Sequence, residues 1–477
     1  MRARTAGLVG LAALLLGGCM VGPDYTKPSV PMTPAYKEAE GWKAAQPSDQ
    51  LPRGQWLAVF GDPELHALEE EVATGNQNLK VAEARLREAR AMVRFNRAAL
   101  FPTISASAGA SSIRDSSNRP FLSPSVSPGS SGDLLLSLDM SYEIDLWGRV
   151  RRTVAAARHE AQATAADLET ARLSLQAELA MDYFELRASD AQEQLLDQTV
   201  KAFEAALQLT TNRFQGGAAP KSDVAQAQTQ LDTTRAQATD VTVQRAQLEH
   251  AIATLIGEPP ATFSLPPRPL AAGPPDVPVG IPSHLLERRP DIAASERRVA
   301  EANEQIGIAK AAYFPALVLN ASVGFEGSSF GNVLNASSLL WAVGATITQT
   351  VFDGGRRHAV SDIARAGYDA TVAAYRQTTL SAFQQVEDNL AALRILDQES
   401  QEQRRAVESA QESLRLFTNR YRGGVDKYLQ VITAQTVTLT NQRTEIDILR
   451  RRMDASVLLV KALGGGWDVA ALTKSEK

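Results

Sequence analysis

Two hexapeptides of this chain are nearly identical: Asn212–Gly217 reads NRFQGG and, 207 residues later, Asn419–Gly424 reads NRYRGG. The similarity extends beyond them at the same offset, because Gly148-Arg149 recurs as Gly355-Arg356, Ala227-Gln228 as Ala434-Gln435, and Gly257 as Gly464. Self-similarity at a fixed offset indicates a structural repeat. The sequence therefore predicts one unit written twice, with a proline-rich connector at 258–283 between the copies.

Each hexapeptide ends a long segment of helical periodicity that is rich in Ala, Leu and Gln. We expect long helices over 150–214 and 358–422, with returning helices that begin near Ser222 and Tyr428. The Gly-Gly pairs supply the backbone freedom that a reversal needs. The hexapeptides are thus predicted to be the tips of two helical hairpins. A further helix is expected from Glu64 to Leu100.

The segment Leu134–Asp145 alternates strictly, with apolar residues at even positions and polar residues at odd ones. A period of two indicates a strand. The same alternation at 103–111, 317–325 and 341–351 predicts four strands in two hairpins, at 103–145 and 316–352. Strands of about ten residues with one apolar and one polar face suit a tilted crossing of an outer membrane. A half-buried sheet in water is the alternative.

The N-terminus has the features of an export signal. Arg2 and Arg4 precede the short apolar run Leu8–Leu16, which predicts a signal peptide at 1–18. Leu16-Gly17-Gly18-Cys19 follows and resembles the bacterial lipobox, so a covalent lipid on Cys19 is expected, and no other cofactor. Met20, where an Asp would favour inner-membrane retention, indicates an outer membrane lipoprotein. An incidental thiol is the alternative.

Four strands cannot close a barrel, and an open sheet edge in lipid leaves backbone groups without partners. The chain must therefore oligomerise. Two copies would supply eight strands and three would supply twelve, and the count alone does not decide between them.

Several function classes are excluded. A net charge of −5 on 477 residues offers no basic field for nucleic acid. The five histidines are scattered and form no metal motif. The stretch GGAAPKS lacks the glycine that a phosphate loop requires, since Pro220 stands before Lys221. An enzyme is therefore not expected. A lipid-anchored periplasmic coiled-coil protein remains as a structural alternative, but it leaves the four strands unexplained.

Together these motifs resemble the TolC-like outer membrane factors, in the lipoprotein, NodT/OprM-like branch. The resemblance rests on the start of the mature chain CMVGPDY at 19–25, on Arg289-Pro290-Asp291-Ile292 with Glu296, on DLWGR and FDGGR after the strands, and on the two tips. It implies a mainly α fold with a transmembrane β-barrel: a homotrimer whose twelve-stranded barrel continues into a periplasmic α-helical barrel.

The family also implies the function, which is the exit duct of a tripartite efflux pump. Drugs or other small molecules would pass from an inner-membrane RND-type transporter, through a periplasmic adaptor protein, to the exterior. A duct for secreted polypeptide or for metal ions is the alternative. The implied segments are an N-terminal equatorial part at 19–63, repeats at 64–257 and 284–463, and a C-terminal tail at 464–477.

Family members close the periplasmic end with residues at the helix tips. By resemblance, the constriction tyrosine is Tyr421 with Asp223 as its acidic partner, and Arg422, Leu429, Gln430 and Thr433 complete the gate. Gln430 and Thr433 stand where members often carry carboxylates. The residues expected to meet the adaptor are Gly216, Gly217, Ala218, Gly423, Gly424 and Val425. Alternatively, Tyr421 is a packing residue and Asp223 an acid placed in a first turn by the helix dipole.

Overall fold

The computed structural model describes residues 20–30, 33–39, 56–114, 116, 130–270, 272–275 and 288–465. The predicted signal peptide, the predicted lipidation residue Cys19 and the tail beyond 465 lie outside these ranges. The chain divides into two compact units. The first takes its residues from 1–29, 85–164 and 295–375, and the second from 30–84, 165–294 and 376–477.

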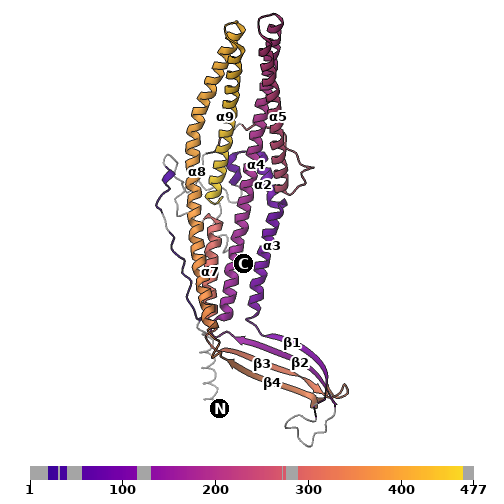
Figure 1. Ribbon diagram of the computed structural model, residues 1–477. Helices are drawn as coiled ribbons and strands as arrows, with labels where there is room; N and C mark the ends of the chain where they lie inside the picture. Colours follow the sequence, from indigo (N-terminus) through magenta and orange to yellow (C-terminus); the bar gives the residue numbers. More distant parts are fainter. Residues whose placement is uncertain are drawn as a thin grey trace. The chain divides into compact units, whose positions relative to one another are not determined.

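Helices dominate the described chain, and all four strands belong to the first unit (Figure 1). The helices are η1 (Lys37–Ala39), η2 (Trp56–Phe60), α2 (Pro63–Gly75), α3 (Gln77–Ala98), α4 (Arg149–Gln215), α5 (Lys221–Ile256), α7 (Pro290–Ala311), η4 (Ala336–Ser338), α8 (Arg356–Arg422) and α9 (Tyr428–Ala462). The strands are β1 (Thr103–Arg114), β2 (Ser130–Ile144), β3 (Ala316–Gly327) and β4 (Leu339–Thr348).

The two long helices α4 and α8 are copies of each other, each with 67 residues. Both start in the same way. The Asp145 carboxylate accepts hydrogen bonds from the amides of Val150 and Arg151, at 3.1 and 2.9 Å. The Asp353 carboxylate accepts the amides of Gly355 and Arg357, at 3.1 and 3.2 Å. An acid that caps the positive end of a helix stabilises its first turn, so the acid before each Gly-Arg pair fixes where the long helices begin.

The helix predicted from Glu64 to Leu100 is wrong as one element, because it breaks at Asn76 into α2 and α3. The Asn76 side chain, buried, donates to the carbonyl of Leu255 at 2.7 Å and accepts from the amide of Leu79 at 3.0 Å. A Cβ on Gly75 would collide with the Ile256 carbonyl. The end of α5 therefore approaches the chain so closely that the break is required.

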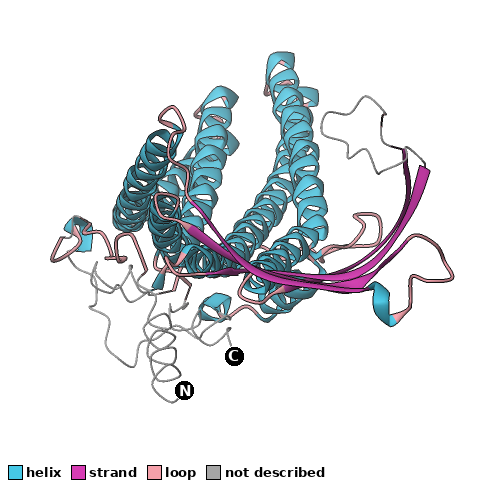
Figure 2. Cartoon of the chain, turned by 90° about the horizontal axis from the view of Figure 1, so that it is seen from below, coloured by secondary structure: helices cyan, strands magenta, loops and turns pink. Residues whose placement is uncertain are grey.

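The four strands form one antiparallel sheet in the order β1-β2-β3-β4, drawn in magenta in Figure 2. Leu138 lies opposite Ala106 on β1 and Val323 on β3, and Val323 lies opposite Trp341 on β4. The register therefore joins the two predicted hairpins side by side, with the second strand of one repeat paired to the first strand of the other.

The second unit packs around buried aromatic and ionic side chains. Trp56 is 1% exposed and its indole donates to Gln176 at 2.9 Å. The Arg187 side chain is 2% exposed and pairs with Glu64 at 2.7 Å and Asp190 at 2.9 Å. Because an unpaired buried charge is costly, this cluster ties α2 to α4.

None of the described helices carries an apolar stretch of the length and hydropathy that crossing a bilayer would need.

Candidate functional site

The sheet has one apolar face that is exposed to an unusual degree. The cross-strand register places the apolar residues of all four strands in the same rows, as the alternation predicts. Large side chains on this face are solvent-exposed: Ile104 by 68%, Trp341 by 72%, Val343 by 76% and Ile347 by 70%. A contiguous apolar surface of this kind marks an interaction with lipid or protein.

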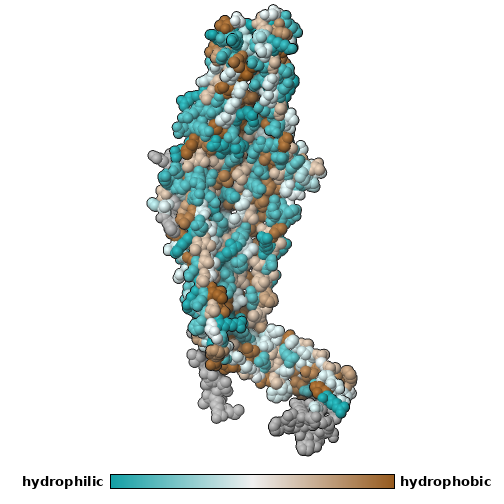
Figure 3. Space-filling view, viewed as in Figure 1, coloured by the Kyte–Doolittle hydropathy of each residue, from teal (hydrophilic) through white to brown (hydrophobic). Residues whose placement is uncertain are grey.

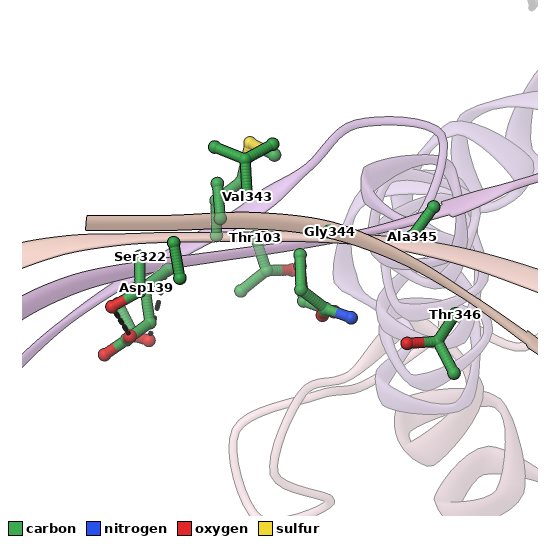
Figure 4. Close-up of a pocket in the computed structure, with 13 residues that line it drawn as sticks. Thr103, Asp139, Ser322, Val343, Gly344, Ala345 and Thr346 are labelled. Carbon is green, nitrogen blue, oxygen red and sulfur yellow. Dashed lines mark hydrogen bonds between the residues drawn. The ribbon is translucent and has the colours of Figure 1, made fainter.

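The opposite face is polar and is centred on Asp139. Its carboxylate accepts hydrogen bonds from Ser137 and Ser322, each at 2.7 Å. Figure 4 shows Asp139 and Ser322 together on one side of the sheet and Val343 on the other side. Asp139 and Ser322 line a shallow pocket, to which Asn320 and Thr346 also contribute. The sheet can thus separate an apolar environment from an aqueous one.

Aromatic residues lie where the strands meet the helices of the first unit. Trp147 stacks on Phe314 with ring centroids 4.6 Å apart, and its indole donates to the Pro315 carbonyl at 2.7 Å. Phe101 and Phe352 are exposed. An indole ring, which is apolar with one polar edge, favours membrane–water interfaces, so the placement of Trp147 agrees with the apolar face.

The two tips reverse the chain with the same backbone geometry. Gly216 donates to Asn212 at 3.0 Å and Ala218 to Arg213 at 2.8 Å. In the second copy Gly423 donates to Asn419 at 2.9 Å and Val425 to Arg420 at 3.0 Å. Gly217 and Gly424 have φ of 73° and 75°, in the left-handed region that favours glycine. The predicted helical hairpins are confirmed, and both turns are exposed.

Tyr421 is buried at the second tip, with 3% of its surface exposed. It packs in a cluster with Ala227, Tyr428 and Val431, and the rings of Tyr421 and Tyr428 lie 5.1 Å apart. Its hydroxyl has no hydrogen-bond partner among the described residues. Within the protomer, Tyr421 therefore forms no hydrogen bond with Asp223, the acidic partner that the resemblance implies, although the ring does occupy the tip.

Asp223 lies half-buried in the first turn of α5. Burial raises the pKa of Tyr428 to about 12, the nearby phenol of Tyr421 and the charge of Asp223 raise it further, and a hydrogen bond with Thr210 opposes this. Tyr428 remains neutral at physiological pH. Tyr428 was predicted only as the start of a returning helix and not as part of the gate, although an aromatic residue at that position was a usable signal.

The other predicted gate residues, Arg422, Leu429, Gln430 and Thr433, lie on the surface of the protomer. Leu429 is 54% exposed and Val425 is 68% exposed, which is high for apolar side chains. Figure 3 shows a mostly hydrophilic helical surface interrupted by separate hydrophobic patches. The exposed side chains of the predicted gate residues are therefore available for contact with other copies of the chain or with a partner.

The described part of the chain has no group of three or more His, Cys, Asp or Glu side chains placed to hold a metal ion.

Comparison with known proteins places this geometry in a family. The model of the family described as "Outer membrane efflux protein" matches residues 68–258 and 281–465, which is one match for each repeat. The chain is 32% identical over 468 residues to "Antibiotic efflux pump outer membrane protein ArpC" of Pseudomonas putida, covering 97% of this chain and 96% of ArpC. The identity and coverage are the same for "Toluene efflux pump outer membrane protein TtgC", also of Pseudomonas putida.

A solved structure, "Structural insights of the outer-membrane channel OprN", superposes with a TM-score of 0.87 at 30% identity. The match covers 94% of this chain and all of that one. The predicted fold class, a mainly helical and duplicated chain with four strands, is confirmed. So is the prediction of an outer membrane channel of an efflux pump with a periplasmic helical part, and not an enzyme. The chain belongs to the outer membrane efflux protein family.

Proposed function

We propose that the chain works as a lipid-anchored homotrimer in which three four-stranded sheets close one twelve-stranded barrel. The observation that carries this proposal is the sheet itself. It has an apolar and a polar face, and β1 and β4 each pair on one side only within the described chain. Unpaired edges are not tolerated in lipid, so neighbouring copies would pair β4 with β1. Cys19 would carry the lipid, one residue before the first described residue.

The trimer would receive cargo from an inner-membrane RND-type transporter through a periplasmic adaptor. The exposed tips around Gly216, Gly217 and Ala218, and around Gly423, Gly424 and Val425, are the surface that would meet the adaptor. The names of ArpC and TtgC give antibiotics and toluene as cargo of related pumps, and we extend small, largely apolar molecules to this chain. Secreted polypeptides or metal ions are the competing cargo.

The tips would also form the closed end of the duct. Tyr421, fixed by packing on Tyr428, Ala227 and Val431, would keep the second tip in its closed position. The surface side chains of Leu429, Gln430, Thr433 and Arg422 would meet their equivalents near the threefold axis, with Asp223 close by. The Tyr421 hydroxyl has no hydrogen-bond partner among the described residues of the protomer. Packing of the ring, and not a hydrogen bond of the hydroxyl, would therefore keep the tip closed.

Conductance of the purified full-length protein in planar bilayers tests this function. We expect the wild type to give small, mostly closed currents. Tyr421→Ala should raise the open probability by more than about tenfold, because truncating a buried aromatic ring costs about 3 to 5 kcal/mol in the packed state. Tyr421→Phe should behave as the wild type, since it keeps the ring. Tyr368→Ala, on the part of α8 that belongs to the other unit, is the control.

Each other result has a definite meaning. If Tyr421→Phe opens the channel as much as Tyr421→Ala does, the hydroxyl forms the closing bond across the assembled trimer. If no variant conducts although the oligomer is intact, the duct proposal is wrong. Cargo is tested separately by expressing the chain in cells that lack outer membrane efflux channels, where restored tolerance of toluene but not of a metal ion would support small apolar cargo.

A further inference from the structure

The two tips have the same backbone geometry, but they differ in the partner of an equivalent arginine. The difference arises from one of the positions at which their sequences differ. In the second tip Arg420 forms a bidentate pair with Asp426, at 2.6 and 3.2 Å. The repeat equivalent of Arg420 is Arg213, and the equivalent of Asp426 is Ala219. Arg213 therefore lacks the acid that holds its counterpart within its own tip.

Arg213 reaches the other tip instead. Its Nη1 donates to the carbonyl of Tyr421 at 2.8 Å and to the carbonyl of Arg422 at 3.1 Å. These carbonyls lie in the last turn of α8, where positive charge is favoured, and the Tyr421 carbonyl also accepts the amide of Gly424 at 3.0 Å. The guanidinium carbon also lies 4.6 Å from the centre of the Tyr421 ring, within the range of a cation–π contact. One side chain thus caps α8 and covers the ring of Tyr421.

We propose that Arg213 is a positioning residue that clamps the tip of α4 to the tip of α8 and holds Tyr421 in its packed position. The clamp also depends on the alanine at 219, because an acid at that position would form an ion pair with Arg213 within its own tip. The inference rests on the proposed function in one respect, namely that Tyr421 keeps the duct closed. Separation of the two tips would have to break this contact in every protomer.

The test compares open probability in planar bilayers for variants of the full-length protein, each first checked for an intact oligomer. Arg213→Ala should raise the open probability about fivefold or more, since it removes a cation–π contact and two charge-assisted hydrogen bonds. Arg420→Ala, the matched arginine of the other tip, should change it little. Arg213→Lys should restore closure in part, because an ammonium keeps the charge but loses the planar fork.

Ala219→Asp is the decisive variant, because it leaves Arg213 present. The introduced carboxylate would stand six residues after Arg213, as Asp426 stands after Arg420, and should compete for the guanidinium. We expect opening with an intact oligomer, and no further opening when Ala219→Asp is combined with Arg213→Ala. An unchanged open probability in both Ala219→Asp and Arg213→Ala would overturn the clamp.

A double variant separates this inference from the proposed gate. If Arg213 acts through Tyr421, then Arg213→Ala combined with Tyr421→Ala opens the channel no further than Tyr421→Ala alone. If the fold-increases in open probability of the two single variants multiply in the double variant, Arg213 acts independently of the ring and the clamp is wrong. If Tyr421→Ala opens the duct and Arg213→Ala does not, the gate stands and the clamp fails. If Tyr421→Ala has no effect, the gate itself fails.

Discussion

Two half-buried carboxylates in the second unit have raised pKa values. They are Asp182 on α4 and Asp454 on α9. Burial raises the pKa of Asp182 to about 6, and the charges of Glu178 and Glu185 raise it further. Burial likewise raises the pKa of Asp454 to about 6 against the opposing charge of Arg450. Between its ordinary value near 3.8 and about 6, each folded carboxyl binds more protons than the unfolded one does.

Stability should therefore fall as the pH rises through the window from about 4 to 6, and stay reduced above it. Asp182→Asn removes this cost. We expect the variant to be more stable than the wild type at pH 8, by on the order of 1 kcal/mol after screening by solvent, and equal to it near pH 4. Thermal unfolding of the detergent-solubilised protein across pH measures this, with Asp232→Asn on the exposed surface of α5 as control. Parallel pH profiles for wild type and Asp182→Asn would contradict the assignment.

At the scale of elements, the close approach of α2 to the end of α5 depends on two glycines. Gly257 has φ of 84°, and a Cβ on it would collide with the carbonyl of Gly75. Gly257→Ala should destabilise the protein by about 2 kcal/mol or more, because a left-handed residue with a side chain costs about 1 to 2 kcal/mol before the collision is counted. Gly367→Ala is the matched control, since a Cβ there meets nothing within 4 Å in the protomer.

That control should be neutral or slightly stabilising, by up to about 1 kcal/mol, as alanine favours a helix interior over glycine. The midpoint of thermal unfolding, followed by circular dichroism, compares the two. Equal midpoints for Gly257→Ala and the wild type would show that the ends of α2 and α5 can move apart.

The elements were predictable where local signals set them. The helices expected at 150–214 and 358–422 are found at Arg149–Gln215 and Arg356–Arg422, because an acid and a glycine mark each start and paired glycines mark each end. The break at Asn76 was not predictable, since its cause is the distant carbonyl of Leu255. The near-identity of the two hexapeptides gives no indication that Arg213 and Arg420 have different partners. Comparing Ala219 with Asp426 was the available signal.

At the scale of the whole molecule, the proposed barrel places one face of the sheet in lipid, and adjacent residues of β4 test this directly. Val343 lies on the apolar face opposite Ala321, whereas Ala342 lies on the polar face opposite Ser322, and both are exposed in the protomer. Val343→Asp should reduce the amount of heat-modifiable oligomer in outer membrane fractions, because a charge facing lipid near the midplane is costly, by about 2 to 4 kcal/mol per copy for Arg or Lys and by less for Asp. Ala342→Asp adds the same charge to the aqueous face and should assemble normally.

The pair isolates the orientation of the sheet, since charge, strand and depth are nearly the same in both variants. In the proposed trimer, oligomerisation would multiply the difference, because closure of the barrel needs every copy to insert. Equal assembly of the two variants would mean that the apolar face is covered by protein and that the strands do not meet lipid. If only Ala342→Asp lost assembly, the sheet would have the opposite orientation, with Asp139 and the serines bound to it facing outward.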